Sequence, residues 1–380
     1  MKKLGFLLSC ALALASVLRA ELKLPAIIGD HMVLQQKQAN PIWGWDTPGT
    51  RVTVKFSGQS YTATAGSDGR WTVKLAAAPA NATPQILSIA GTTQRDVTDV
   101  LIGEVWMCSG QSNMQWSLGQ TYTGDIEGAG ARRPNLRIVS VPQVGTQELK
   151  TDFKGKWEVA NPANAKDFSA IGYLYGRYLY DILDVPVGLI DNAWGGSAAE
   201  AWVRRETIEK DPRFSLLMAG AKQREADAAS AKTKADFEAA TEKHKVASAA
   251  AKAAGKTATP PPQNPLAWLN GNARPGNIFA GVVNPTLGYG IKGVIWYQGE
   301  SNQRRAFQYQ ELLPTMINDW RKRWDSELPF YIVQLASYGN KKPVSTSAGE
   351  ADTWAELQEA QYLTAITLPK CGLAVAKREH

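Results

Sequence analysis

The pattern of apolar and polar positions along the chain changes near residue 100. Between residues 21 and 100, short runs of alternating apolar and polar residues are separated by turn residues such as Ser67-Asp68-Gly69. Residues 51–56 and 71–75 are two of these runs. Alternation is typical of strands that bury one face. We therefore expect a small all-β sandwich domain over residues 21–100.

Residues 101–380 show a different pattern, in which continuous apolar runs alternate with helical segments. Continuous apolar strands separated by helices indicate a parallel sheet that is covered on both faces. The fold class expected for this domain is α/β, a three-layer α/β/α arrangement with a parallel sheet. The strand-like runs are 100–108, 136–141, 186–190, 291–297 and 330–335, and residues 170–183 and 309–324 have apolar positions at helical spacing.

A helical insertion is predicted at about residues 205–262. Its middle part is rich in Ala, Lys, Glu, Asp and Gln, and it ends at Pro260-Pro261-Pro262, which cannot continue a helix. The segment lacks a continuous apolar stripe, so we expect a solvated surface rather than a membrane or partner site. His244 falls here and is expected at the surface.

The first twenty residues are predicted to be an export signal and not part of the fold. Lys2 and Lys3 precede a mostly apolar stretch over residues 4–18, and Ala20 is small enough for a cleavage site. Cys10 lies in a run that loosely resembles a lipoprotein cleavage box, but too near the start to leave an apolar core before it. We expect ordinary export to the periplasm or the extracellular space. No later stretch approaches membrane-spanning length, so no membrane partner is expected.

Charge and cysteine content exclude several classes of function. Loss of Lys2, Lys3 and Arg19 with the signal would lower the net charge from +7 to +4, and no basic patch is interleaved with aromatic residues. Nucleic-acid binding is therefore not expected. Cys108 lies in an apolar run, which predicts a buried free thiol, and Cys371 is the other cysteine after residue 20. The sequence does not predict an oligomeric state.

Three predicted strands end in segments that are suited to chemistry. Ser112 lies on a Gly-Gln-Ser-Asn turn directly after the strand at 100–108, a position that exposes a serine above a sheet. Gly195 and Gly196 follow the strand at 186–190, where glycine allows close backbone approach to a bound group. Gln298 follows the strand at 291–297. All three should meet at the carboxyl ends of adjacent parallel strands, where open α/β sheets bind ligands.

The same segments resemble a known family. Residues 103–114 closely resemble the nucleophile block of sialate O-acetylesterases, a branch of the SGNH hydrolases. Residues 194–202 and 296–302 resemble the second and third blocks, in the family's order, and residues 24–45 match its β-rich opening.

The resemblance implies a role for each matched residue. Ser112 would be the nucleophile, and the oxyanion donors would be its own N–H, the N–H of Gly195 (with Gly196 as the alternate) and the side-chain amide of Gln298. Glu300 and Asn302 would hold their loop through hydrogen bonds. The family reaction needs no metal or organic cofactor, so none is expected.

The implied activity is hydrolysis of O-acetyl esters on sialic acid or related glycans through an acyl-serine intermediate. The expected partner is thus an acetylated carbohydrate. Two alternatives stay open at this point. An acetylxylan-type esterase would share the acetyl chemistry, and a non-catalytic glycan-binding remnant would keep the site without turnover.

The alternative of a non-catalytic remnant arises because the family's general base is missing from residues 1–380. The family supplies it from an Asp-x-x-His-Pro block, and the run-up to that block is present at 354–361 and 368–375. The sequence then ends at His380, which has Lys377 where the aspartate should be. His31 and His244 belong to the β-rich opening and the insertion. We therefore expect a truncated family member that lacks the base and its orienting acid, with feeble activity.

Overall fold

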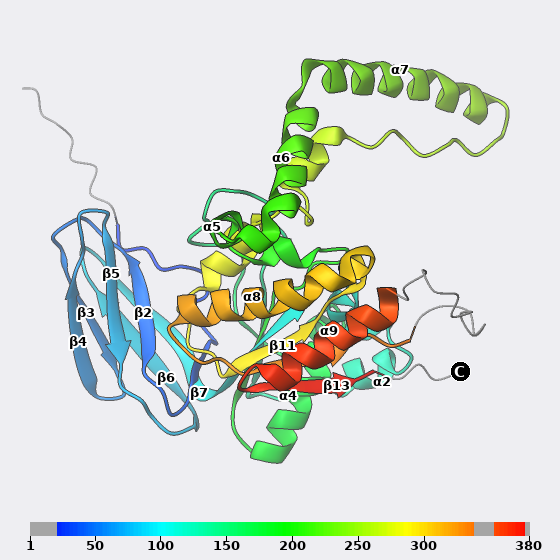
Figure 1. The fold of residues 1–380 in the computed structure, drawn as a ribbon. Coiled ribbons are helices and arrows are strands. Elements are labelled where there is room, and N and C mark those ends of the chain that lie inside the picture. Colours follow the sequence, from blue (N-terminus) through cyan, green and yellow to red (C-terminus); the bar gives the residue numbers. More distant parts are fainter. Residues whose placement is uncertain (1–20, 338–352, 377–380) are drawn as a thin grey trace, which may run out of the picture.

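The computed structural model of the protein describes residues 21–337 and 353–376 (Figure 1). The expected export signal at residues 1–20 and the candidate base His380 lie outside the described residues. Within the described ranges, no helix is long and apolar enough to cross a membrane.

The fold is of the α/β class, with a mixed sheet and helices beside it. The path through the sheet runs β13-β12-β11-β7-β10-β8-β9, and every neighbouring pair is parallel except β8 and β9. These strands are β7 (Gln94–Gly110), β8 (Leu136–Ser140), β9 (Glu158–Val159), β10 (Val187–Asp191), β11 (Gly293–Tyr297), β12 (Phe330–Gln334) and β13 (Cys371–Val375).

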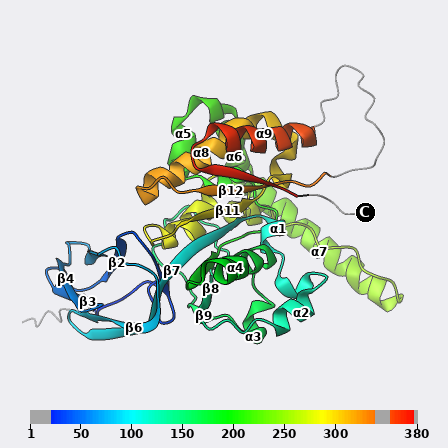
Figure 2. The ribbon, with the colours of Figure 1, turned by 90° about the horizontal axis from the view of Figure 1, so that it is seen from below.

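Helices lie on both sides of the parallel strands. Figure 2 shows α8 and α9 on one side of β11 and β12, and α4 on the other side, beneath β7. The helices of this part are α1 (Ser112–Gln115), α2 (Gly124–Ala129), α3 (Pro162–Ala165), α4 (Ala170–Leu183), α8 (Ala306–Trp324) and α9 (Thr353–Thr367). Helix α4 begins where the Ser169 hydroxyl caps the N–H of Gly172, and it ends at Asp184 in the left-handed conformation.

Burial on both faces explains the continuous apolar runs in the sequence. Residues 100–110 of β7 are all buried, and successive side chains enter different clusters. Met107 packs in the larger core with Trp296 and Trp320, whereas Trp106 and Cys108 pack in the smaller core on the α4 side. The predicted buried free thiol at Cys108 is confirmed, and burial raises its pKa well above the usual range, which makes the thiol inert.

The expected domain boundary at residue 100 falls inside β7. The first half of this strand pairs with β6 and β1, and its second half pairs with β10 and β11. One continuous strand therefore links the β-rich opening to the parallel sheet, as Figure 1 shows. The other strands of the opening are β1 (Val33–Gln35), β2 (Asn40–Trp45), β3 (Arg51–Phe56), β4 (Gln59–Thr64), β5 (Arg70–Leu75) and β6 (Asn81–Ala90).

Three helices occupy most of the range 205–262. These are α5 (Arg205–Lys210), α6 (Ser215–Ala229) and α7 (Ala231–Ala253). Helix α6 rises from the body and contributes buried residues, including Met218 and Ala221, whereas α7 projects away and buries none of its residues (Figure 1). The chain returns to the body through a short helix at Pro265–Asn270.

Candidate active site

The turn that carries Ser112 is fixed by a glycine and a buried glutamine. Gly110 has φ 141°, and a Cβ there would lie 2.1 Å from the carbonyl oxygen of Tyr297, so no other residue fits without a shift. The Gln111 N–H donates to that same oxygen at 2.9 Å. The buried Gln111 side chain accepts from the N–H groups of Gly299 and Ser301. Ser112 is then exposed at the first position of α1.

The Gly195 turn lies directly beside Ser112. The Trp194 N–H donates to the carbonyl oxygen of Gly110 at 2.9 Å, which ties the end of β10 to the end of β7. A Cβ on Gly195 would lie 3.6 Å from both Cα and Cβ of Ser112. The predicted meeting of these two segments at the carboxyl ends of adjacent strands is therefore confirmed, although the role of each residue stays a prediction.

The N–H of Gly195 already has a partner. It donates to Oε1 of Gln115 at 2.5 Å, and Gln115 is exposed on the same short helix as Ser112. An amide oxygen thus occupies the place where the expected oxyanion would be bound. The backbone oxygen of Gly195 accepts from Nδ2 of Asn272 at 2.6 Å.

Gln298 lies at the end of β11 but differs from the expectation of a free donor. Its side chain is fully buried, and Nε2 donates to the carbonyl oxygen of Ser197 at 3.0 Å and to Oδ1 of Asn302 at 2.8 Å. Its Oε1 accepts from the Tyr309 hydroxyl. A buried amide must satisfy its polar atoms internally, so Gln298 braces the loops here. Service as a third oxyanion donor would require it to give up one of these bonds.

Asn302 and Glu200 connect the second and third blocks. Oδ1 of Asn302 accepts from the Ala199 N–H at 2.9 Å, and its Nδ2 donates to Glu200. Glu200 is also paired with Arg305. These are the loop-holding hydrogen bonds that we expected of Asn302.

Glu300 is a carboxylate linked to the nucleophile turn. Its Oε1 accepts from the Asn113 side chain at 2.7 Å, as expected for a loop-holding residue, whereas its buried Oε2 has no hydrogen-bond partner among the residues that the structure describes. Burial raises the pKa of the Glu300 carboxyl above its usual range, against the lowering effect of the N–H groups of Glu300, Gly299 and Asn113. Asp191, which ends β10, is more strongly affected, because burial raises its pKa to about 7.

Neither histidine in the described part of the chain belongs to this site. The ring nitrogen Nδ1 of His31 pairs with Asp99 at 2.7 Å, and the backbone N–H of His31 donates to the carbonyl oxygen of Thr98. Thr98 and Gly110 lie on the same strand, and a rise of about 3.3 Å per residue separates them by about 40 Å. His244 lies on the projecting α7 and contacts the Thr259 carbonyl oxygen. These two placements agree with the expectation from the sequence.

Two contacts at the site were not foreseen. Gln115 lies three positions after Ser112, so helical spacing could have suggested that it stays near the nucleophile. Asn272 lies in the return from the insertion and carries no motif, so no sequence signal indicated its contact with Gly195.

Comparison with known proteins identifies relatives of this chain. A family model described as carbohydrate esterase, sialic acid-specific acetylesterase, matches residues 268–375. The chain is 28% identical to a sialate O-acetylesterase of Mus musculus over 92% of its length and 66% of that protein. A sialate O-acetylesterase of Rattus norvegicus is 30% identical over 82% of the chain and 59% of that protein.

A solved carbohydrate acetylesterase from Xanthomonas citri is 31% identical, with a TM-score of 0.72, over 93% of this chain and 68% of that one. The chain spans slightly less than two thirds of the length of the mouse relative and still less of the rat one. Sequence identity and fold agree over nearly the whole chain, and the chain belongs to the sialate O-acetylesterase family of carbohydrate esterases.

Proposed function

We propose that this protein is a serine esterase that removes O-acetyl groups from sialic acid or related glycans. The observation that carries the proposal is the exposed Ser112 at the end of the central strand, with the backbone of Gly195 beside it. A preorganised N–H beside a nucleophilic serine suits the tetrahedral intermediate of acyl transfer. The names of the relatives support an acetyl ester of a carbohydrate as the substrate.

The reaction would proceed through an acyl-serine intermediate. The Ser112 oxygen attacks the acetyl carbonyl carbon while its proton passes to a base, and the N–H groups of Ser112 and Gly195 stabilise the oxyanion. Collapse breaks the bond to the sugar oxygen, which takes the proton and leaves as a hydroxyl. Water then attacks the acetyl-serine, so that acetate leaves and Ser112 regains its proton.

We infer that full turnover requires the family's Asp-x-x-His-Pro block. Neither His31 nor His244 is followed by proline, and the described structure bonds them to Asp99 and to the carbonyl oxygen of Thr259. Without a base, what remains in a serine hydrolase is about 10³–10⁴-fold over water, from the oxyanion hole and from binding.

The test is to extend the chain at its C-terminus with a family segment that bears this block. Hydrolysis of 4-nitrophenyl acetate should rise by about 10⁴-fold, because nucleophile and base act as a unit. Ser112→Ala in the extended chain should remove the gain, whereas Ser112→Ala in residues 1–380 should change the weak rate little. An extension that gives no Ser112-dependent gain would contradict the proposal and would favour a glycan-binding remnant.

The substrate class separates a sialate O-acetylesterase from an acetylxylan-type esterase. Acetylated sialic acid and acetylated xylan should be compared with the extended chain, and we expect faster release of acetate from the sialic acid. Faster release from xylan would instead assign the protein to the acetylxylan type.

Two broader expectations belong to the same proposal. We propose that residues 1–20 direct export to the periplasm or the extracellular space. N-terminal sequencing of exported protein tests this, since an intact Met1 would contradict it.

We also propose that residues 21–100 form a supporting β-sandwich and that the remainder is a three-layer SGNH-type domain. The antiparallel pairing of β3 with β4 and β6, and helices on both sides of the parallel strands, support this arrangement, which a crystal structure would test.

A further inference from the structure

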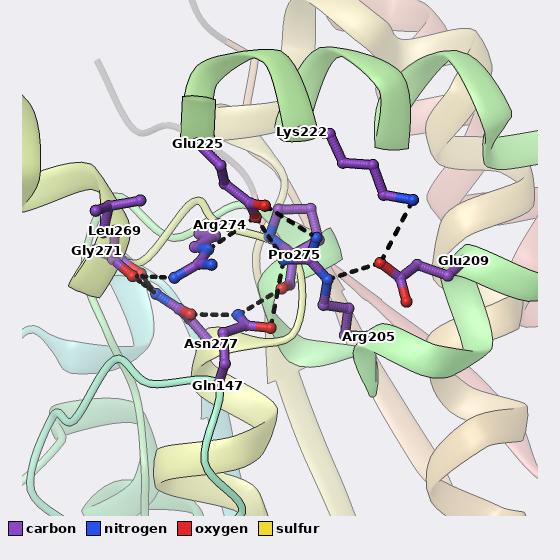
Figure 3. Close-up of polar contacts among 10 residues, drawn as sticks. All are labelled: Gln147, Arg205, Glu209, Lys222, Glu225, Leu269, Gly271, Arg274, Pro275 and Asn277. Atoms are coloured by element: carbon purple, nitrogen blue, oxygen red, sulfur yellow. Dashed lines mark hydrogen bonds and ion pairs between the residues drawn. The ribbon is translucent and has the colours of Figure 1, made fainter. Parts of the chain in front are cut away.

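A cluster of charged residues lies where the helical insertion joins the body. Glu225 of α6 accepts from Arg205 at 2.5 and 3.2 Å and from Nε of Arg274 at 2.9 Å (Figure 3). Arg205 also donates to Glu209 of α5, which lies 3.9 Å from Lys222. The side chains of Arg205, Glu225 and Arg274 are all about four-fifths buried. Charge-assisted bonds of this kind are the strong ones, and their loss leaves partly buried charges unpaired.

The cluster organises the return segment at residues 269–277. Arg274 donates to the carbonyl oxygen of Leu269 at 2.9 Å, and the buried Asn277 donates to the oxygens of Leu269 and Gly271 (Figure 3). Gln147 donates to the Pro275 oxygen at 3.0 Å and to Asn277 at 2.5 Å. These hydrogen bonds link the two ends of the segment, so that residues 269–277 form one closed loop.

That loop holds the active-site turn. Nδ2 of Asn272 donates to the carbonyl oxygen of Gly195 at 2.6 Å, and the Asn272 carbonyl oxygen accepts from the Ala198 N–H at 3.1 Å. A continuous chain of hydrogen bonds and backbone therefore leads from Glu225, through Arg274 and the loop, to the residue beside Ser112. Among the described residues, the hydrogen bonds and ion pairs of this chain of bonds come from outside the projecting α7.

We propose that Glu225 is a positioning residue that holds the Gly195 turn through Arg274 and Asn272. Helix α6, where the insertion joins the body, thus supports the active-site turn through hydrogen bonds that do not involve α7. This inference rests on the proposed function for its effect on turnover, but the mechanical link is independent of activity. A misplacement of about 1 Å can cost about 100-fold in rate, so a turn that must present an N–H to an oxyanion needs such support.

Amide hydrogen exchange of peptides covering 192–200, in the full chain, tests the link. In Glu225→Ala and in Asn272→Ala these amides should exchange about tenfold faster than in the wild type. The double variant should be no faster than either single one, because both act along one path. Glu225→Gln, which keeps the side-chain volume and one accepting oxygen, should lie between. Glu242→Ala on α7, where Glu242 pairs only with Lys245, is the matched control and should leave exchange unchanged.

A kinetic measurement separates positioning from general stability. In the chain extended with the Asp-x-x-His-Pro block, where hydrolysis of an acetyl ester should depend on Ser112, Glu225→Ala should lower kcat about tenfold with KM within about twofold. Unchanged exchange at 192–200 in Glu225→Gln and Asn272→Ala would overturn the inference, even if Glu225→Ala fails to fold. Altered exchange, combined with an extended chain that shows no Ser112-dependent hydrolysis, would uphold the link and contradict the proposed function instead.

Discussion

Oε1 of Gln115 accepts a hydrogen bond from the N–H of Gly195 at 2.5 Å, so a side chain of the short helix that begins at Ser112 fills the position proposed for the substrate's oxyanion. Gln115 is exposed, so its side chain can rotate away. A substrate carbonyl that binds to the Gly195 N–H must displace the Gln115 oxygen in this way. In the structure without substrate, the Gln115 amide oxygen therefore takes the hydrogen bond that the substrate oxygen would take.

Gln115→Met should open this position. Methionine has a similar length but no carbonyl acceptor, and a neutral hydrogen bond contributes about 0.5–1.5 kcal/mol. In the chain extended with the Asp-x-x-His-Pro block, we expect Ser112 to react about three- to tenfold faster with a fluorophosphonate probe, measured by the rate of labelling. Gln94→Met, at an exposed position at the start of β7 and far from its Ser112 end, is the control and should be neutral. Slower labelling of Gln115→Met would show that Gln115 helps to bind the reacting group.

Gly110→Ala should disrupt the nucleophile turn. A Cβ would meet the Tyr297 oxygen at 2.1 Å in a conformation that disfavours any side chain, so we expect a loss of more than about 3 kcal/mol in the free energy of unfolding, measured in urea. Gly220→Ala is the matched control. Gly220 lies within α6 with open space around its Cα, so this change should be neutral or stabilise by about 0.5 kcal/mol. Equal effects of the two changes would refute the argument.

Asp191 should make the protein less stable as the pH rises. Its pKa is about 7 in the folded protein against an ordinary value of 3.8, so the folded state binds the proton more tightly between these values. The free energy of unfolding should fall as the pH rises from about 4 to about 7, by at most about 4 kcal/mol. Asp191→Asn can still accept from the Ala193 N–H and should flatten this dependence.

The thermal midpoint of Asp191→Asn, measured at pH 4, 6 and 8, checks this prediction. The variant should gain over the wild type mainly at pH 8. Asp236→Asn, on the exposed α7, is the control. A variant that is less stable than the wild type at pH 8 would show that the Asp191 carboxylate has a stabilising role.

Histidine should not limit the weak activity of residues 1–380. His31 and His244 are bonded elsewhere, and His380 has Lys377 in place of the family's aspartate. Each His→Ala variant should hydrolyse 4-nitrophenyl acetate within about twofold of the wild-type rate. A large fall for His380→Ala would mean that this residue reaches Ser112 and acts as the base.

The sequence by itself determined the local parts of this protein. Continuous apolar runs indicated strands buried on both faces, and the order of the three strand-end blocks predicted that Ser112 and Gly195 would meet. It did so because the carboxyl ends of parallel strands lie at one edge of a sheet. The buried thiol of Cys108 followed from the same pattern.

Only the tertiary structure decided which polar groups pair across long separations in sequence. Gln298 proved to be buried, with both N–H groups committed, because α8 and α9 cover the end of β11. Gln115 accepts from the N–H of Gly195 and Asn272 donates to its carbonyl oxygen, although 80 and 77 residues separate them from it. The single strand β7 runs from the β-rich opening into the parallel sheet, so the expected boundary at residue 100 falls inside one strand. Periodicity reports burial within one element, whereas these contacts depend on where distant elements are packed.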